Sequence, residues 1–235
     1  MFTERDKKMG YYTSLIVLIP AILFAAYAQA KVSSAYRRYS NVRNSRGITG
    51  AQAARMILDA NGLSDVPISR IQGKLTDNYN PAKRTMNLSA GVYDNVSVAA
   101  ISIAAHESGH AIQDSESYAP LKLRNSIVPI VNIGSMAAWP LLFIGLMIGP
   151  GTGDVLFNIG VIMFMSVVVF HLITLPVELN ASQRAIAQLE GRGIVTSKEE
   201  VHAAKSVLSA AALTYLAALA MAIANLLRIF LMRRN

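Results

Sequence analysis

The sequence contains a five-residue segment whose residue types and spacing match a metal-dependent hydrolase, His106-Glu107-Ser108-Gly109-His110. On a helix, His106 and His110 lie one turn apart on the same face, with their Cβ atoms roughly 5–6 Å from each other. Two imidazoles at that spacing can bind the same zinc ion, and Glu107 can act on a water molecule bound to the metal. The segment therefore predicts a zinc hydrolase with two histidine ligands and Glu107 as general base.

A catalytic zinc site of this kind needs a third protein ligand and leaves one position for water. The chain has no cysteine, so the third ligand must be a histidine or a carboxylate. His202 lies in a polar segment, and His171 lies in an apolar run, where it is either functional or bonded within a helix bundle. Glu178 directly follows that run, and we expect it to be the ligand. The alternative is a solvated glutamate at a helix that begins after Pro176.

The composition indicates a membrane protein. The 235-residue chain is 53% hydrophobic and 15% charged, whereas a soluble domain carries about 25% charged residues. Its apolar residues are concentrated in long runs, which suit the interior of a bilayer. The net charge of +8 would also suit a nucleic-acid partner, but basic loops between spans more often reflect membrane orientation. We therefore expect the lipid bilayer, and not nucleic acid, as a partner.

Apolar runs long enough to cross a bilayer occupy residues 11–30, 123–148, 155–175 and about 206–227. The first run ends in Ala28-Gln29-Ala30, which resembles a signal-peptidase site, so a cleaved signal peptide is the alternative interpretation. The basic residues that follow, beginning with Lys31, resist translocation and favour an uncleaved span.

The turn over residues 149–153 is too short to cross a membrane, so the second and third spans form an antiparallel hairpin. The hairpin returns Glu178 to the side of the membrane that carries His106 and His110. Four spans place both termini on one side, and the polar segments with their flanks carry 16 of the 22 Lys and Arg residues. The positive-inside rule then predicts that the catalytic region faces the cytoplasm.

The polar residues before the second span contain the elements that must position the site. We expect a helix over 51–61 ended by Gly62, strands over 66–71, 73–76 and 85–88, a turn over 77–81, and the zinc helix over about 96–116. Ser108 and Gly109 are small enough to allow another helix to pack closely behind the metal. Further along, Ser197 and Glu200 match a capping box that opens a helix running into the fourth span.

Three segments of the chain resemble the YugP family of bacterial membrane zinc metallopeptidases. They are residues 75–89, beginning Leu-Thr-Asp-Asn-Tyr-Asn-Pro, residues 104–113, which contain the histidine motif, and residues 175–185, Leu-Pro-Val-Glu-Leu-Asn-Ala-Ser-Gln-Arg-Ala. The resemblance implies one zinc ion held by His106, His110 and Glu178, with Glu107 as catalytic base. It also implies kinship with HtpX-like integral membrane proteases and a location in the bacterial inner membrane.

The chain departs from the expected family pattern at Asn180, where we would expect an aspartate. If this position orients a ligand histidine by accepting its ring proton, the amide oxygen can still do so, but without a charge.

The predicted fold class is an α-helical integral membrane protein with four transmembrane helices and a small α+β, zincin-like catalytic region of the gluzincin type. Its segments are 1–30 with the first span, 31–122 with the small sheet and zinc helix, 123–177 as the transmembrane hairpin, 178–205 as the third-ligand helix and linker, and 206–235 as the fourth span with a basic tail.

These residues predict a zinc endopeptidase. Glu107 takes a proton from the metal-activated water and passes it to the leaving amine. The developing oxyanion needs a donor besides zinc. We expect Arg184 to supply it; a surface arginine is the alternative interpretation, and Tyr79 or Tyr93 could serve instead. The polypeptide substrate is expected to pair with an edge of the small sheet at residues 85–88.

Two other classes of function are compatible with parts of the sequence. The first is a non-enzymatic zinc-stabilised membrane scaffold or an inactive protease-like binding protein. Glu107 argues against it, because a structural zinc site has no use for a base and is usually closed by a fourth protein ligand. The second is a transporter, which would need charged or polar residues deep in several spans, and of this kind we identify only His171.

Overall fold

The computed structural model describes residues 15–234 of the chain. These residues form two compact units, which are described separately. The helical unit comprises the described residues up to 28, residues 123–175 and the residues from 214 onward. The α+β unit comprises residues 29–122 and 176–213.

Three long helices supply most of the helical unit: α6 (Ala119–Ile148), α7 (Thr152–Gly191) and α8 (Lys198–Arg234). Within the described residues, these three helices are long and apolar enough to cross a membrane, and they contain the second, third and fourth predicted spans. The 40 residues of α7 extend for about 60 Å at 1.5 Å per residue. Because a bilayer core is only about 30 Å thick, α7 extends well beyond its apolar part.

The predicted first span lies partly outside the described residues. Its second half is helical as the beginning of α2 (Ile19–Tyr39), and residues 11–14 are not among those the structure describes. The helix α2 is not one of the candidate spans found in the described chain. The first predicted span, and with it the total of four, therefore stays a prediction.

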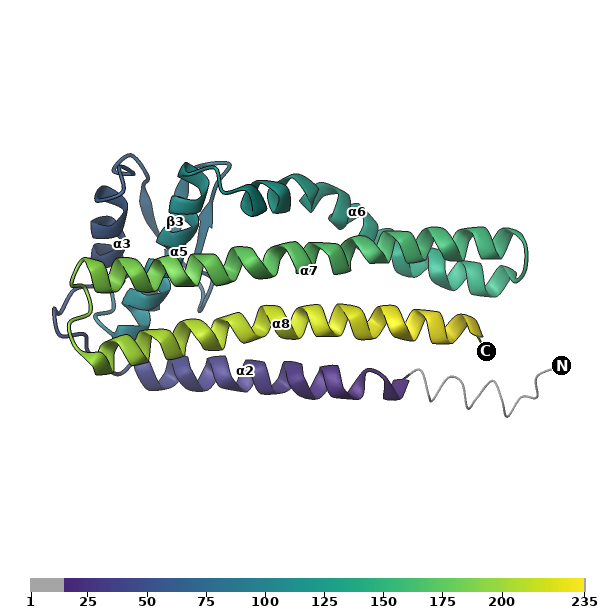
Figure 1. The fold of residues 1–235 in the computed structure, drawn as a ribbon, viewed down its shortest axis with the longest axis horizontal. Coiled ribbons are helices and arrows are strands. Elements are labelled where there is room, and N and C mark those ends of the chain that lie inside the picture. Colours follow the sequence, from purple (N-terminus) through teal and green to yellow (C-terminus); the bar gives the residue numbers. More distant parts are fainter. Residues whose placement is uncertain (1–14, 235) are drawn as a thin grey trace. The chain divides into compact units, whose positions relative to one another are not determined.

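Helices α6 and α7 form the predicted hairpin, joined by a turn in which Gly149 and Gly151 have φ angles of +81° and +90° (Figure 1). Close to the turn, the two helices nearly touch. A Cβ atom on Gly145 would lie 2.7 Å from the carbonyl oxygen of Gly153, so a larger residue would force the helices apart. Inside the unit, Leu142, Phe157, Phe164 and Ile229 form a buried cluster that includes a residue of α8.

The α+β unit contains a three-stranded sheet in the order β1-β3-β2. The central strand β3 (Thr85–Ser89) pairs in parallel with β1 (Ile68–Ile71) and antiparallel with β2 (Asn78–Asn80). The helices of this unit are α3 (Gly50–Asp59), α4 (Ala90–Tyr93) and α5 (Val98–Ser115), together with the ends of α2, α7 and α8. The predicted strands at 66–71 and 85–88 are thus confirmed.

The prediction was wrong for the chain between β1 and β3. Residues 73–76 form a loop, in which Gly73 and Leu75 have positive φ angles of +107° and +56°. The strand instead lies at Asn78–Asn80, within the predicted turn. The reason is that Asp77 accepts hydrogen bonds from the backbone and hydroxyl of Ser89, at 2.7 and 3.0 Å, which fastens this segment to the end of β3. The polar residues that suggested a turn therefore hold a short strand in place.

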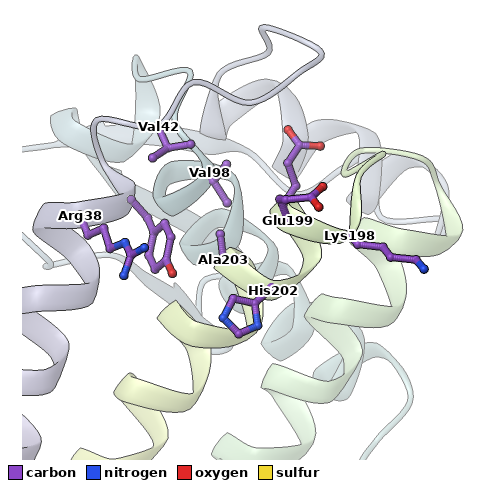
Figure 2. A pocket seen from close by; sticks show the side chains of 9 residues that line it. Arg38, Val42, Val98, Lys198, Glu199, His202 and Ala203 are labelled. Carbon is purple, nitrogen blue, oxygen red and sulfur yellow. The ribbon is translucent and has the colours of Figure 1, made fainter.

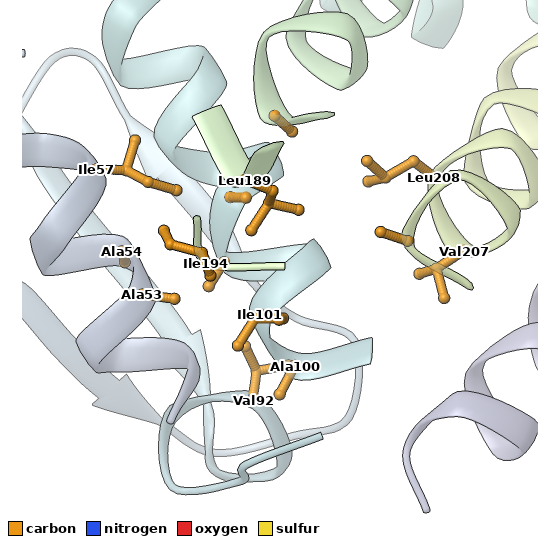
Figure 3. Packing of buried hydrophobic residues seen from close by; sticks show 14 of the residues in the cluster. Ala53, Ala54, Ile57, Val92, Ala100, Ile101, Leu189, Ile194, Val207 and Leu208 are labelled. Atoms are coloured by element: carbon orange, nitrogen blue, oxygen red, sulfur yellow. The ribbon is translucent and has the colours of Figure 1, made fainter. Parts of the chain in front are cut away.

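Helix α5 lies among the other elements of the α+β unit, and its residues from Val98 to Ala105 are largely buried (Figure 3). Ile57 on α3, Ile101 on α5, Leu189 on α7 and Leu208 on α8 belong to the same hydrophobic cluster. This common core holds α5 and the second half of α7 in the same unit, which allows both to contribute to one site.

The ends of the helices follow the predicted capping signals. Gly62 has a φ of +72° just after α3, and the Leu63 amide reaches back to the Leu58 carbonyl. Ser197 and Glu200 exchange side-chain to backbone hydrogen bonds of 3.1 and 3.4 Å, and the capping box opens the unbroken helix α8. In contrast, Pro176 does not start a new helix, because α7 continues through it.

Candidate metal centre

The histidine motif occupies the second half of α5, as predicted. Ser97 caps the start of the helix by accepting a hydrogen bond from the Ala100 amide. The His106 and His110 rings lie on one face, with their centroids 4.8 Å apart and their planes at 83°. Helical geometry thus brings the two imidazoles together, as the four-residue spacing requires.

Glu178 reaches both histidines from α7. Its Oε2 atom is 3.2 Å from Nε2 of His106 and 3.4 Å from Nε2 of His110. The carboxylate is buried, with only 3% of Glu178 exposed. The alternative of a solvated glutamate at a helix start is therefore wrong.

The donor set of His106, His110 and Glu178 fits zinc. Its three donor atoms lie within 4.8 Å of one another, so within the described residues these side chains could hold one metal ion. Atoms that bind a tetrahedral zinc at about 2.0–2.2 Å lie roughly 3.3–3.6 Å from each other. The two distances from Glu178 are close to that range, and two histidines with one glutamate are an accepted ligand set for catalytic zinc.

Small residues allow α7 to approach α5 at this point. A Cβ atom on Gly109 would lie 2.6 Å from the carbonyl oxygen of Ala181, so only glycine fits there. Ser108 is also buried, and its hydroxyl donates to the Ala104 carbonyl within α5. The predicted close packing behind the histidines is confirmed.

The other ring nitrogen of each histidine also has a partner. Nδ1 of His106 lies 3.2 Å from the Ser182 hydroxyl, and Nδ1 of His110 lies 3.0 Å from Oε1 of Gln113. Both Nε2 atoms are therefore directed at Glu178. Asn180 contacts neither ring in this arrangement; its oxygen accepts a hydrogen bond from Gln113 instead.

Sequence reasoning missed Gln113 and Ser182. A signal was present for both, since Gln113 follows His110 by three residues and Ser182 follows Glu178 by four. Residues at these spacings lie on the same face of a helix.

The surroundings of the site lower the pKa of Glu178 and raise the pKa of His110. Burial would raise the pKa of Glu178, but hydrogen bonds with His106 and His110 and their positive charge lower it well below its usual range. For His110, burial disfavours the charged ring and would lower its pKa. The neighbouring Glu178 and Glu107 carboxylates outweigh burial, so the pKa of His110 is raised. A cation at this position is thus favoured by the surrounding groups.

Glu107, on α5, contacts the edge strand β2 of the small sheet. The Tyr79 amide donates a hydrogen bond of 2.9 Å to Oε2 of Glu107, and the Tyr79 hydroxyl donates one of 2.8 Å to Asp114. Because this amide faces Glu107, it points away from β3 and lies on the open edge of β2. The expected substrate edge at residues 85–88 is wrong, since β3 is central and paired on both sides.

The remaining candidates lie apart from the three donors. Arg184 donates from Nε to Asn180 at 2.8 Å and pairs with Glu116 at 2.7 Å. His202 lines a separate cavity of about 440 Å³ (Figure 2). The other residues that line this cavity include Arg38 at the end of α2 and residues at the starts of α5 and α8. His171 lies in the helical unit and is not part of the donor group.

The described chain thus combines three helices able to span a membrane with a group of three side chains that could hold a metal ion. The chain belongs to the family described as "Putative neutral zinc metallopeptidase", whose model matches residues 14–234. It is 46% identical over 221 residues to the "Putative membrane protease YugP" of Bacillus subtilis (strain 168), which covers 94% of this chain and 96% of that relative. The predicted resemblance is therefore confirmed. No solved structure matches the chain.

Proposed function

We propose that this protein is a membrane-embedded, zinc-dependent endopeptidase. One observation carries the proposal: Glu178, from a different helix, lies 3.2 and 3.4 Å from the Nε2 atoms of His106 and His110, with Glu107 beside them. Membership of a zinc metallopeptidase family supports the same conclusion.

The proposed metal ligands are His106, His110 and Glu178, which would hold one zinc ion per chain. When bound, zinc supplies a Lewis acid that polarises a carbonyl group and lowers the pKa of a water molecule to about 7. Glu107 is the proposed general base, which accepts a proton and passes it to the leaving amine. Its hydrogen bond from the Tyr79 amide occupies Oε2 and leaves Oε1 for this proton.

Arg184 stays our proposed donor to the oxyanion. In the structure its guanidinium group is held by Glu116 and Asn180. The Glu116 side chain is 55% exposed, so this ion pair contributes little and can be exchanged for a substrate contact. Tyr79 is a weaker candidate, because its hydroxyl already donates to Asp114.

The proposed substrate is an extended polypeptide that pairs with the open edge of β2. A peptide there would lie beside Tyr79, whose amide is 2.9 Å from the Glu107 carboxylate. The side-chain oxygens of Asn78 and Asn80 already have partners within the described chain. Asn78 accepts a hydrogen bond from Asn87 on β3, and Asn80 accepts one from the Lys83 amide.

We place the protein in a bacterial inner membrane with four spans and its catalytic region in the cytoplasm. The basic residues of the polar segments support this orientation through the positive-inside rule. The bacterial relative, described as a membrane protease, supports the compartment. The residues that precede and begin α2 would form the first span.

The alternative is a zinc-stabilised scaffold without activity. A purely structural zinc site is normally closed by four protein ligands. The donor group in the described residues has three, which leaves one position for water and favours an enzyme.

The purified protein in detergent tests the proposal. Wild type should contain about one zinc per chain by elemental analysis and should cleave an unstructured protein such as casein. Glu107→Ala should retain the zinc and lose the cleavage, because it removes the base and no ligand. Glu178→Ala should lose both. Wild type without stoichiometric zinc, or a Glu107→Ala variant that cleaves equally well, would refute the proposal.

A further inference from the structure

A buried amide holds one of the two histidines in a defined state. We propose that Gln113 is a positioning residue that keeps His110 in the tautomer able to bind zinc, and that Asn180 locks the orientation of Gln113. The inference rests on the proposed zinc site, and it adds two residues to that site.

Gln113 is fully buried on α5, and both ends of its amide are engaged. Its nitrogen donates to the Val177 carbonyl at 2.8 Å and to the Asn180 oxygen at 2.9 Å. A primary amide has two N–H groups, so these two acceptors use both. Turning the amide over would break two hydrogen bonds and leave buried polar groups unpaired, which is unfavourable. Oε1 is therefore the atom that faces His110.

This orientation decides which nitrogen of His110 carries hydrogen. The Oε1 atom can only accept, so Nδ1 of His110, 3.0 Å away, must be the donor. In a neutral ring, hydrogen on Nδ1 leaves the Nε2 lone pair free, and Nε2 is the atom that faces Glu178. By contrast, the Ser182 hydroxyl beside His106 can donate or accept, so it does not select a tautomer.

The orientation of the Asn180 amide is also fixed by its hydrogen bonds. Its Oδ1 atom accepts from Gln113 and also from Nε of Arg184, at 2.8 Å. Two donors at one atom require oxygen at that position, so the Asn180 amide cannot turn over either. Arg184 is held in turn by Glu116. Asn180 and Val177 flank Glu178 on α7, so the helix that supplies the third donor also fixes Gln113.

The arrangement explains how a neutral side chain serves where an aspartate was expected. Asn180 acts on Gln113, which is neutral, and Gln113 acts on the histidine. The requirement at position 180 is therefore an acceptor for two donors, which either asparagine or aspartate provides.

The zinc affinity of the purified chain, measured by competition with a chromogenic chelator, tests the proposal. Gln113→Met removes the acceptor at nearly constant volume and should weaken zinc binding about 10- to 100-fold, the usual effect of losing such a partner. Asn180→Leu should weaken it in the same direction, whereas Asn180→Asp should bind as wild type does. The matched control is Gln188→Met on α7, because Gln188 bonds to Asn61 and Arg192, away from the donors. It should leave the affinity unchanged.

A second measurement separates positioning from folding. Histidine ¹⁵N chemical shifts of the metal-free chain, at a pH where the rings are neutral, report the tautomer of each ring. Wild type should show His110 with hydrogen on Nδ1, and Gln113→Met should show hydrogen on Nε2 as well. Unchanged zinc affinity in Gln113→Met, or hydrogen on Nε2 in wild type, would overturn the inference. Because neither measurement uses peptide cleavage, a wild type that binds zinc without proteolysis would refute the proposed function alone.

Discussion

Gly109 on α5 lies directly against the carbonyl group of Ala181 on α7, where a Cβ atom would come within 2.6 Å of the oxygen. Ala181 is three residues beyond Glu178, so this contact sets the helix separation at which the carboxylate meets the two histidines. The smallest residue of the histidine motif thus governs the distance to the third donor.

Gly109→Ala should therefore damage the site without changing any donor. The added methyl group must push α7 away, which costs typically about 1–3 kcal/mol in a packed interior. We expect at least a tenfold loss of zinc affinity, measured by chelator competition, and a lower melting temperature. Gly191→Ala is the control, since a Cβ atom there has no neighbour within 4 Å. Equal zinc affinity in both variants would show that the Gly109 contact does not set the geometry.

Ser182→Ala tests the partner of the other histidine. The hydroxyl lies 3.2 Å from Nδ1 of His106, so its loss frees the ring to rotate. The hydroxyl is uncharged, so we expect zinc affinity to fall about tenfold, the lower end of the range for such partners. As a control, Ser102→Ala removes a buried hydroxyl of α5 that donates to the Val98 carbonyl, and it should keep wild-type affinity. If the two variants bind zinc alike, Ser182 has no positioning role.

Local patterns predicted the parts of the site that depend on one element. The four-residue spacing placed His106 and His110 together, and the signals at Gly62 and Ser197 marked helix ends. These features were predictable because they depend only on residues within one or two helical turns. The donor Glu178 was also predicted, because the hairpin of apolar helices constrains where the chain returns.

The contacts that the sequence did not predict are those between elements. Gln113 gains its role only when Val177 and Asn180 arrive from α7, and no spacing along the chain indicates that meeting. The strand β2 also depends on a contact between elements. Asp77, just before β2, accepts a hydrogen bond from Ser89 at the end of β3, so residues typical of a turn support a strand. Arg184 was assigned to the oxyanion from its place on the helix, whereas its ion pair with Glu116 depends on α5.

Glu200 should be important for the stability of the α+β unit. Its carboxylate accepts backbone hydrogen bonds from Ser45 at 2.6 Å and Thr196 at 2.9 Å, which join the start of α8 to a distant loop. Glu200→Gln should lower the free energy of unfolding by about 1–3 kcal/mol, the usual cost of weakening hydrogen bonds to a charged group. Glu199→Gln is the matched control, because that neighbouring side chain is exposed. Thermal melts in detergent at neutral pH compare the two.

Acid should remove the stabilisation that the Glu200 carboxylate provides. Burial raises the pKa of Glu200, but hydrogen bonds from Thr196 and Ser45 outweigh it and lower the pKa below 4.5. A carboxylate with a lowered pKa stabilises the fold above its unfolded value and loses that effect as pH falls through the folded value. The melting temperatures of wild type and Glu200→Gln should thus converge below about pH 4. A constant difference down to pH 3 would show that the charge of Glu200 is not involved.

Zinc binding should compete with protons at the donor group. In the metal-free chain the pKa of His110 is raised above 6.5 and that of Glu178 is lowered below 4.5, through their mutual contact. Zinc must displace the proton of His110, so apparent affinity should rise with pH until the raised pKa is passed, by up to about tenfold per unit for one proton. Chelator competition between pH 6 and 9 measures this slope, and a flat profile would contradict the raised pKa of His110.

The stability of the metal-free chain should fall as pH rises, whereas its zinc affinity should increase. A raised pKa on His110 gives stability that is complete below the unfolded value of 6.5 and is lost as pH rises through the folded value. The lowered pKa of Glu178 gives stability that is present above 4.5. The metal-free protein should therefore melt highest between these two values and lose stability toward alkaline pH. Zinc-loaded protein should keep its melting temperature there, because the bound cation replaces the proton. His110→Asn, without a titrating ring, should abolish the alkaline loss in the metal-free state.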